Sequence, residues 1–200
     1  MVPVNVSDYA AEVLTWLQKL ERKTVVQALR PPIDRTRLES DLARLQLRPC
    51  EDLLAFYLWA GGTAAPTDGS LDDLHFFPGF YWLSWEDAVR NFLTFRADAR
   101  WRPGWFPVFA NGGGDFYVVD CGERGGSRCG VIGFLLGERE QLLEYESLTT
   151  MLATILDCYR TGCFFVDGRG YLEMVDASLA KIAKIHNPLV PLWQSAGRSQ

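Results

Sequence analysis

The sequence predicts an α+β fold in which helices flank a mostly antiparallel sheet. Helical periodicity covers the N-terminal part of the chain, segments with strand composition cluster in the middle, and a further strong helix follows them. This order differs from the regular alternation of strands and helices that builds a parallel sheet, so a βαβ architecture is not expected.

Three helices are expected before the sheet. Apolar residues at helical spacing follow Ser7, which is placed to cap the first helix, and Pro31 ends that region. A second helix starts near Asp34 and is broken by Pro49. The third runs from Pro49 to Gly61, and its segment LLAFYLWA is apolar nearly all round, so we expect it to be buried.

The expected strands come next. Residues 63–73 form a polar loop, and the aromatic segment LHFFPGFYWL is extended with an interruption at Pro78. Ser84 then caps a short helix, which precedes the strands WFPVF, DFYVVDC and GVIGFLL with turns at NGGG and ERGGSR. Ser147 caps the last long helix, which Gly162 terminates.

The remaining residues form a tail. A hairpin is expected around Asp167-Gly168, and a helix from about Asp176 to His186 follows it. The sequence thus divides into an N-terminal helical extension (1–33), a core domain (34–163) and a C-terminal extension that packs on the core (164–200).

The three glycines at 112–114 raise the question of a phosphate site. A phosphate-binding loop needs a helix after the glycines, because the N-terminal amides of that helix face the anion. Here a strand follows, and there is no lysine between Lys23 and Lys181. Asn111-Gly112 is also a strong hairpin signal. We therefore expect the glycines to reverse the chain.

Charge is unevenly distributed along the chain. Residues 1–48 carry a net charge of +2, residues 49–163 carry −8 and residues 164–200 carry +1. The negative middle disfavours direct binding of DNA or RNA and favours a basic protein partner. Because the sequence has neither a long apolar run nor the features of a signal peptide, no membrane contact and a cytoplasmic location are expected.

Metal, cofactor and catalytic patterns are weak. The five cysteines have irregular spacing, so reduced thiols without a metal or cofactor are expected. The only histidines, His75 and His186, lie in a predicted strand and at a predicted helix end, where structural roles are more common. For acid/base hydrolysis the nearest paired carboxylates are Asp115 with Asp120, which point to opposite faces of a strand, and Glu138 with Glu140.

Acidic runs and tryptophans are the remaining surface signals. The seven tryptophans exceed what a core of this size strictly requires, although most are explained as core residues. Exchange of Asp72 and Asp73 for asparagine is expected to leave the melting temperature nearly unchanged. The candidate partner contacts are Asp68, Asp72, Asp73, Trp82, Trp85, Glu138, Glu140 and Glu144.

Several stretches, taken in order, resemble the SUKH superfamily, and specifically its Smi/Knr cell-wall-regulator-like branch. They are PCEDLLAFYLWAGG, FYWLSWEDAV, WFPVFANGGGDFYVVD, GVIGFLL and SLTTMLATIL, and the similarity spans residues 34–162. The resemblance implies helices packed on an antiparallel sheet and a binding role without catalysis. Bacterial members of this kind are typically immunity proteins that neutralise toxins, many of them nucleases, and eukaryotic relatives regulate cell-wall synthesis.

Three hypotheses follow for the function. The first is an immunity-type protein that covers a cognate, basic toxin, with acids of 68–73 and 138–146 and exposed Trp82 or Trp85 as contacts. The second is a regulatory or scaffold module that binds a host protein. The third and least favoured is a small hydrolase that uses paired carboxylates.

Overall fold

The computed structural model describes residues 5–64, 70–122 and 129–195, and it confirms the predicted α+β class. Its elements are, in chain order, α1 (Val6–Lys19), α2 (Lys23–Gln27), α3 (Arg35–Arg44), α4 (Glu51–Trp59), the 3₁₀ helix η1 (Leu71–Leu74), β1 (His75–Phe77), β2 (Phe80–Trp82), α5 (Trp85–Phe95), β3 (Trp105–Ala110), β4 (Phe116–Asp120), β5 (Val131–Phe134), β6 (Leu142–Tyr145), α6 (Leu148–Arg160), β7 (Phe164–Val166), β8 (Leu172–Met174), α7 (Asp176–His186) and α8 (Pro191–Ser195).

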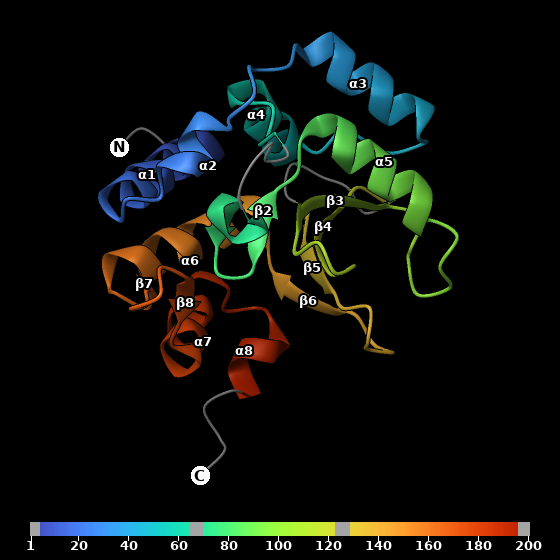
Figure 1. Cartoon of the computed structure of the whole chain (residues 1–200). Coiled ribbons are helices and arrows are strands. Elements are labelled where there is room, and N and C mark those ends of the chain that lie inside the picture. The colour runs from blue at the N-terminus through green and yellow to red at the C-terminus, as the bar shows by residue number, and fades with distance from the viewer. Residues whose placement is uncertain (1–4, 65–69, 123–128, 196–200) are drawn as a thin grey trace.

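The main sheet has six antiparallel strands whose spatial order β1 to β6 follows the chain (Figure 1). Neighbouring strands in such a meander need only short connections, apart from the insertion of α5 between β2 and β3. The aromatic segment gives β1 and β2, and the three strands predicted after Trp101 are β3, β4 and β5. Strand β6 was not predicted; it pairs with β5 through Val131 and Tyr145.

The three glycines reverse the chain between β3 and β4, as predicted. The Asn111 side-chain oxygen accepts hydrogen bonds from the backbone N–H of Gly113 at 2.7 Å and of Asp115 at 3.1 Å. Gly112 and Gly114 have φ angles of +82° and +104°, which side chains rarely tolerate. Because the amides bond to Asn111, they are not gathered round an anion.

Most helix caps follow the predicted pattern. The side chains of Asp34, Ser84 and Ser147 accept hydrogen bonds from the first turns of α3, α5 and α6. The predicted cap of α1 was wrong by two positions, because Asn5 is the N-cap and Ser7 already lies inside the helix. The Asn5 side-chain oxygen accepts from the Ser7 backbone N–H at 2.9 Å, so an amide oxygen takes the place of the expected hydroxyl.

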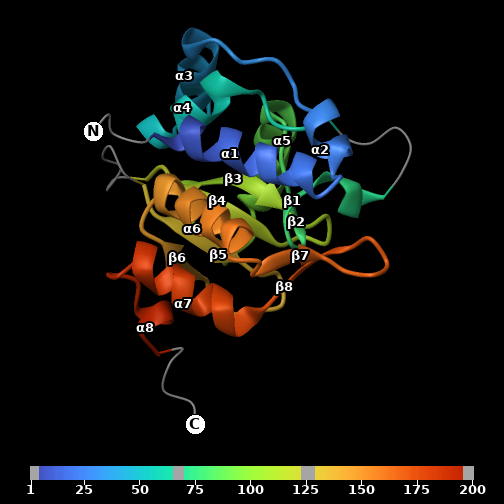
Figure 2. The same cartoon turned by 90° about the vertical axis from the view of Figure 1, so that its left-hand side faces the viewer.

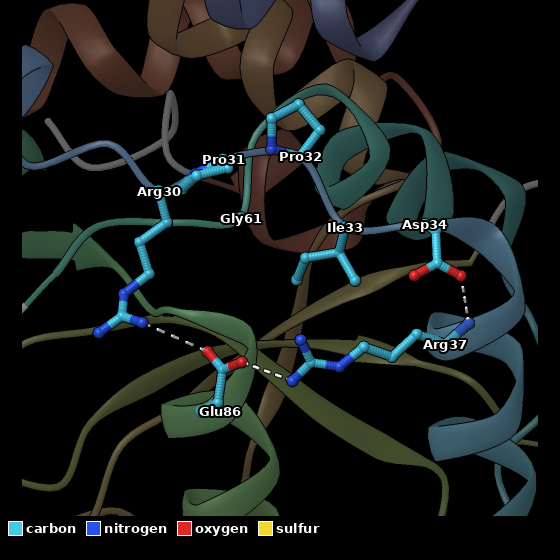
Figure 3. Close-up of a pocket in the computed structure, with 8 residues that line it drawn as sticks. All are labelled: Arg30, Pro31, Pro32, Ile33, Asp34, Arg37, Gly61 and Glu86. Atoms are coloured by element: carbon cyan, nitrogen blue, oxygen red, sulfur yellow. Dashed lines mark hydrogen bonds and ion pairs between the residues drawn. The ribbon is translucent and has the colours of Figure 1, made fainter.

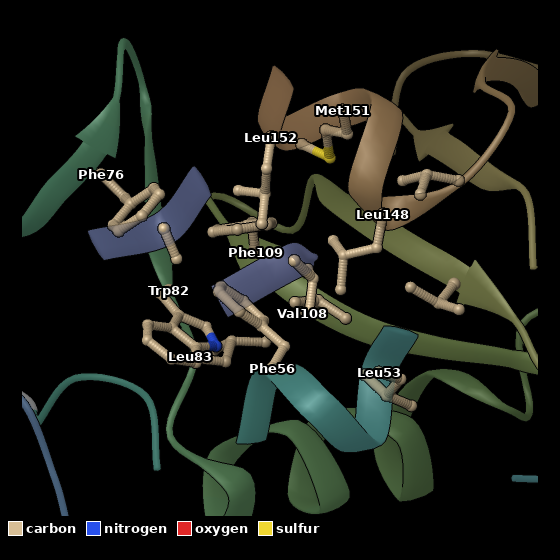
Figure 4. Close-up of a cluster of buried hydrophobic side chains, with 14 of the residues drawn as sticks. Leu53, Phe56, Phe76, Trp82, Leu83, Val108, Phe109, Leu148, Met151 and Leu152 are labelled. Carbon is tan, nitrogen blue, oxygen red and sulfur yellow. The ribbon is translucent and has the colours of Figure 1, made fainter. Parts of the chain in front are cut away.

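Helices cover both faces of the central strands. All six residues of β3 are buried, which requires cover on each side of the strand. Side chains of α4 and α6, including Phe56 and Leu152, pack around Trp82 and Phe109 (Figure 4). Helices α1 and α6 lie side by side in front of the sheet in Figure 2. The ring of Phe106 in β3 packs against aromatic side chains of α5.

Gly61 and Gly62, which follow α4, allow the backbone to pass close to the segment after α2 and to Leu83. A Cβ on Gly62 would lie 2.1 Å from the Leu83 carbonyl oxygen, and Gly62 has a φ of +85°. The Gly62 carbonyl accepts a hydrogen bond from the Arg30 N–H at 2.8 Å, and the Gly61 N–H donates to the Arg30 carbonyl at 3.0 Å. The segment that follows α2 is therefore held against the end of α4.

The tail forms the predicted hairpin and helix. Strands β7 and β8 pair through Phe164 and Met174, and α7 covers the predicted range. Helix α8 packs on β6, where the Trp193 ring lies 6.0 Å from the ring of Tyr145. One cluster of buried side chains runs from Val6 to Leu172, so the three-part division of the chain stays a prediction. Within the described ranges, no helix combines the length and apolar character that crossing a membrane requires.

Candidate protein-binding surface

The connection between β5 and β6 exposes leucines and acids together. Four leucines there are between 40% and 47% exposed, although free leucine side chains favour burial. The exposed carboxylates of Glu138 and Glu140 form no ion pair with a described residue. We define this hairpin-end surface by its six residues: Leu135, Leu136, Glu138, Glu140, Leu142 and Leu143.

Hydrogen bonds hold the hairpin-end surface in place. The Gln141 side chain accepts from the Leu135 N–H at 2.6 Å and donates to the carbonyls of Leu135 and Glu138 at 3.0 and 2.8 Å. The Leu136 N–H donates to the Asp115 carboxylate at 2.8 Å, which ties the turn to the start of β4. Arg100 also donates to the Leu136 carbonyl. The exposed side chains therefore stand on a fixed backbone.

Glu144 differs from the solvated acid that the sequence predicted. Its side chain lies over Gly133 of β5, and the Tyr117 hydroxyl donates to its carboxylate at 3.0 Å. The indole N–H of Trp193 donates to the Glu144 carbonyl. Burial raises the pKa of the Glu144 carboxyl to about 7, although the hydrogen bond from Tyr117 opposes the rise. Glu144 is therefore a partly buried group whose carboxylate is bonded within the sheet.

The acids of the 68–73 run do not form an open acidic patch in the described part of the chain. Asp72 pairs with Arg22 at 2.8 Å, and this arginine is only 8% exposed. Arg22, the N-cap of α2, also donates to the Gly170 carbonyl at 2.9 Å, so the pair links the start of α2, η1 and the tail hairpin. Asp73 caps η1 by accepting from the Ser70 N–H at 3.0 Å. Asp68 lies outside the described residues.

The expectation of an exposed Trp82 or Trp85 was wrong. Trp82 is 0% exposed, and its ring stacks on Phe56 with centroids 3.9 Å apart. Trp85 is 1% exposed and donates its indole N–H to Asp41 at 2.9 Å. The ring of Tyr57 in α4 contacts both tryptophans, with centroids 5.6 and 4.9 Å away, so their size serves packing in the core.

A shallow pocket of about 260 Å³ lies between the start of α3 and the start of α5 (Figure 3). Glu86 stands at its centre and pairs with Arg30 at 3.8 Å and with Arg37 at 2.5 Å. Asp34 accepts from the Arg37 backbone N–H at 2.9 Å. Because two carboxylates balance two guanidinium groups, the pocket offers no net charge to a ligand.

The candidate catalytic groups are separated and already bonded. Asp115 and Asp120 flank or end β4 and accept hydrogen bonds from the backbone N–H groups of Leu136 and Gly122. The His186 ring lies 2.8 Å from Asp157 at the end of α7. All five cysteines are buried and free of disulfides. Among the described residues, no three histidine, cysteine or acidic side chains are grouped as a metal site requires.

Sequence reasoning missed the exposed leucines. GVIGFLL was assigned to one strand, but β5 ends at Phe134 and leaves Leu135 and Leu136 in the connection. The available signal was the symmetry of the segment, in which a Leu-Leu pair stands on each side of the polar turn GEREQ. Adjacent side chains of a strand point to opposite faces, so a Leu-Leu pair is fully buried only where both faces of the sheet are covered, as they are at β3.

Two comparisons with known proteins bear on this fold. The model of the SMI1 / KNR4 family (SUKH-1) matches residues 44–154, which is more than half of the chain. The matched stretch contains the complete main sheet and the hairpin-end surface. A search of curated proteins found no match.

Proposed function

The chain belongs to the SMI1/KNR4 family (SUKH-1), and from this we propose that it is a non-catalytic protein-binding module that neutralises a cognate toxin by covering it. Family membership is the observation that carries the proposal, since bacterial proteins of the Smi/Knr-like branch are typically immunity proteins. The proposal places the protein in the cytoplasm, where such a toxin acts. A regulatory scaffold related to the cell-wall-synthesis regulators is the alternative within the same family.

The hairpin-end surface supports a protein partner. Stable interfaces combine an apolar centre with a polar rim, and here exposed leucines stand beside the unpaired carboxylates of Glu138 and Glu140. Leaving these leucines in water costs free energy that a partner's apolar surface would recover. A fixed backbone lowers the entropy lost on binding.

Charge supports a basic toxin. The middle of the chain carries the acidic excess, and a basic partner would be steered to it at a raised association rate. Among the candidate contacts, Glu138 and Glu140 are the ones that remain exposed and unpaired in the described residues. Asp68 stays in the proposal as an untested contact. Asp73 caps η1 through one carboxylate oxygen and keeps the other for a partner.

Co-expression with the product of the adjacent toxin-like gene tests the proposal. The wild-type chain should restore growth and form a complex in size-exclusion chromatography. Exchange of Leu142 and Leu143 for aspartate should remove both effects, because charged groups would replace the apolar centre. Leu93→Asp is the matched control, since Leu93 is 45% exposed on α5 and outside the surface. If the wild-type chain gives neither rescue nor complex, the proposed role is wrong.

A further inference from the structure

A cavity of about 460 Å³ borders the hairpin-end surface. It lies between the connection that follows α5 and the start of β6, and Trp105 and Leu142 line it together with the charged groups. Three of the lining residues are arginines, and the only acid among them is Glu140. This excess of positive charge is unexpected in a segment whose net charge is −8.

Two of these three arginines, Arg102 and Arg139, have no ion-pair partner among the described residues and could pair with a ligand. Arg100 is engaged by Asp98 at 2.7 Å, and the paired guanidinium lowers the pKa of Asp98 to about 2. Arg102 and Arg139 are exposed, and neither forms an ion pair with a described residue. The cavity therefore presents two guanidinium groups that no described carboxylate neutralises.

The walls of the cavity are held in position. The Arg102 guanidinium lies 5.5 Å from the centroid of the Trp105 ring, a cation–π contact that limits its conformational freedom. Arg100 donates to the Leu136 carbonyl and, at 3.5 Å, to the Glu138 carbonyl, so one wall is bonded to the other. The Trp101 indole donates to the Trp105 carbonyl at 3.1 Å. Binding here would require little reorganisation of Arg100 and Arg102.

We propose that this cavity binds a carboxylate of an acidic peptide segment between Arg102 and Arg139. Guanidinium groups match carboxylates in geometry and form charge-assisted hydrogen bonds with them. Leu142 supplies an apolar contact for a neighbouring side chain of the same segment. The inference rests on the proposed function, because the segment is expected to belong to the toxin.

The surrounding acids favour a short peptide over a nucleic acid strand. A strand would extend beyond the two arginines and place further phosphates near Glu138 and Glu140. A peptide can instead follow its acid with apolar or basic residues, which suit the exposed leucines and glutamates of the hairpin-end surface. The cavity therefore places positive charge from Arg102 and Arg139 next to the negative charge of Glu138 and Glu140.

Fluorescence anisotropy on the full chain tests the inference with three labelled probes: a peptide of leucines and lysines that carries a single glutamate, its glutamine counterpart, and oligothymidylate of the same length. The glutamate peptide should bind most tightly. The double variant Arg102→Glu/Arg139→Glu should weaken its binding by about tenfold or more, since two charge-assisted contacts are reversed. The same variant should gain affinity for a peptide that alternates leucine and lysine.

Arg96→Glu is the matched control, because Arg96 is exposed at the end of α5 and does not line the cavity. Unchanged melting temperatures establish that the variants fold. The inference is overturned if the wild-type chain does not bind the glutamate peptide, if the double variant binds it like the wild type, or if oligothymidylate binds more tightly. Toxin rescue by the wild-type chain is measured separately, so the proposed function can stand when this site fails.

Discussion

The Tyr117 hydroxyl donates a hydrogen bond to the Glu144 carboxylate at 3.0 Å, on a strand against which α8 packs. Burial raises the pKa of Glu144 from 4.5 to about 7. In the unfolded chain Glu144 ionises near its ordinary pKa, whereas in the folded chain it keeps its proton to a higher pH. Its stabilising contribution is therefore complete below about pH 4.5 and is lost as the pH rises through 7.

Exchange of Glu144 for glutamine should remove this pH dependence. Glutamine keeps an oxygen that accepts from Tyr117 and carries no charge to desolvate. At pH 8 the variant should be more stable than the wild type by up to about 3 kcal/mol, and at pH 4 the difference should vanish. Urea unfolding at both pH values measures the two differences. An equal difference at pH 4 and pH 8 would contradict the assigned burial.

The sequence alone predicts that exchange of Asp72 for asparagine leaves the melting temperature nearly unchanged. The ion pair between Asp72 and Arg22 instead predicts a loss of stability. Asp72→Asn leaves the buried Arg22 guanidinium without its counter-charge, which should cost about 3 kcal/mol. Asp73→Asn keeps an oxygen for the Ser70 N–H and should cost less than about 0.5 kcal/mol. Thermal melts of the two variants give the comparison. Coinciding melting temperatures would refute the structural role of Asp72.

The features that could be predicted are those that short stretches determine. Ser147 caps α6 and Asn111 turns the chain into β4 because each acts on residues no more than four positions away. Strands β3 to β5 are likewise recognisable from their own composition, since each is an apolar run rich in β-branched and aromatic residues. Local chemistry of this kind also gave the tail hairpin around Asp167, whose carboxylate accepts from the Tyr171 N–H at 2.9 Å.

The features that could not be predicted depend on distant partners. Glu144 is sheltered by distant partners, because Tyr117, 27 positions away, bonds its carboxylate and Trp193, 49 positions away, bonds its backbone carbonyl. Asp72 meets Arg22 across 50 positions. Strand β6 has two leucines and a glutamate in sequence, a pattern that does not alternate, and its strand form comes from pairing with β5. For the candidate surface, the acids were predicted, whereas the exposed leucines and the two unpaired arginines were not.

Exchange of Gly62 and of Gly79 for alanine distinguishes the cost of backbone strain from the cost of a steric clash. Gly62 and Gly79 have φ angles of +85° and +80°, so both substitutions carry the penalty of the left-handed region, about 1–2 kcal/mol. A Cβ on Gly79 meets no atom within 4 Å, but on Gly62 it lies 2.1 Å from the Leu83 carbonyl oxygen. Gly62→Ala should therefore cost more than about 4 kcal/mol. Denaturant midpoints compare the stabilities of the two variants. Similar midpoints would show that Gly62 does not approach the Leu83 carbonyl closely enough to exclude a Cβ.

Charge reversal at Glu138 and Glu140 should slow association with a basic toxin. Both side chains are exposed, so lysines there should change stability little while removing the attraction that steers the partner. At low salt the association rate should fall by about tenfold, and at high salt the variant and wild type should converge because ions screen exposed charges. Stopped-flow mixing or surface plasmon resonance at several salt concentrations measures this.

The control for this reversal is a double change to lysine at Glu21 and Asp176, which are exposed and lie in the turn between α1 and α2 and at the start of α7. It alters the net charge by the same amount without touching the hairpin-end surface. If steering acts through the local field of Glu138 and Glu140, the control should keep most of the wild-type rate. Equal slowing in both double variants would show that only total charge matters, and would remove these two glutamates from the binding face.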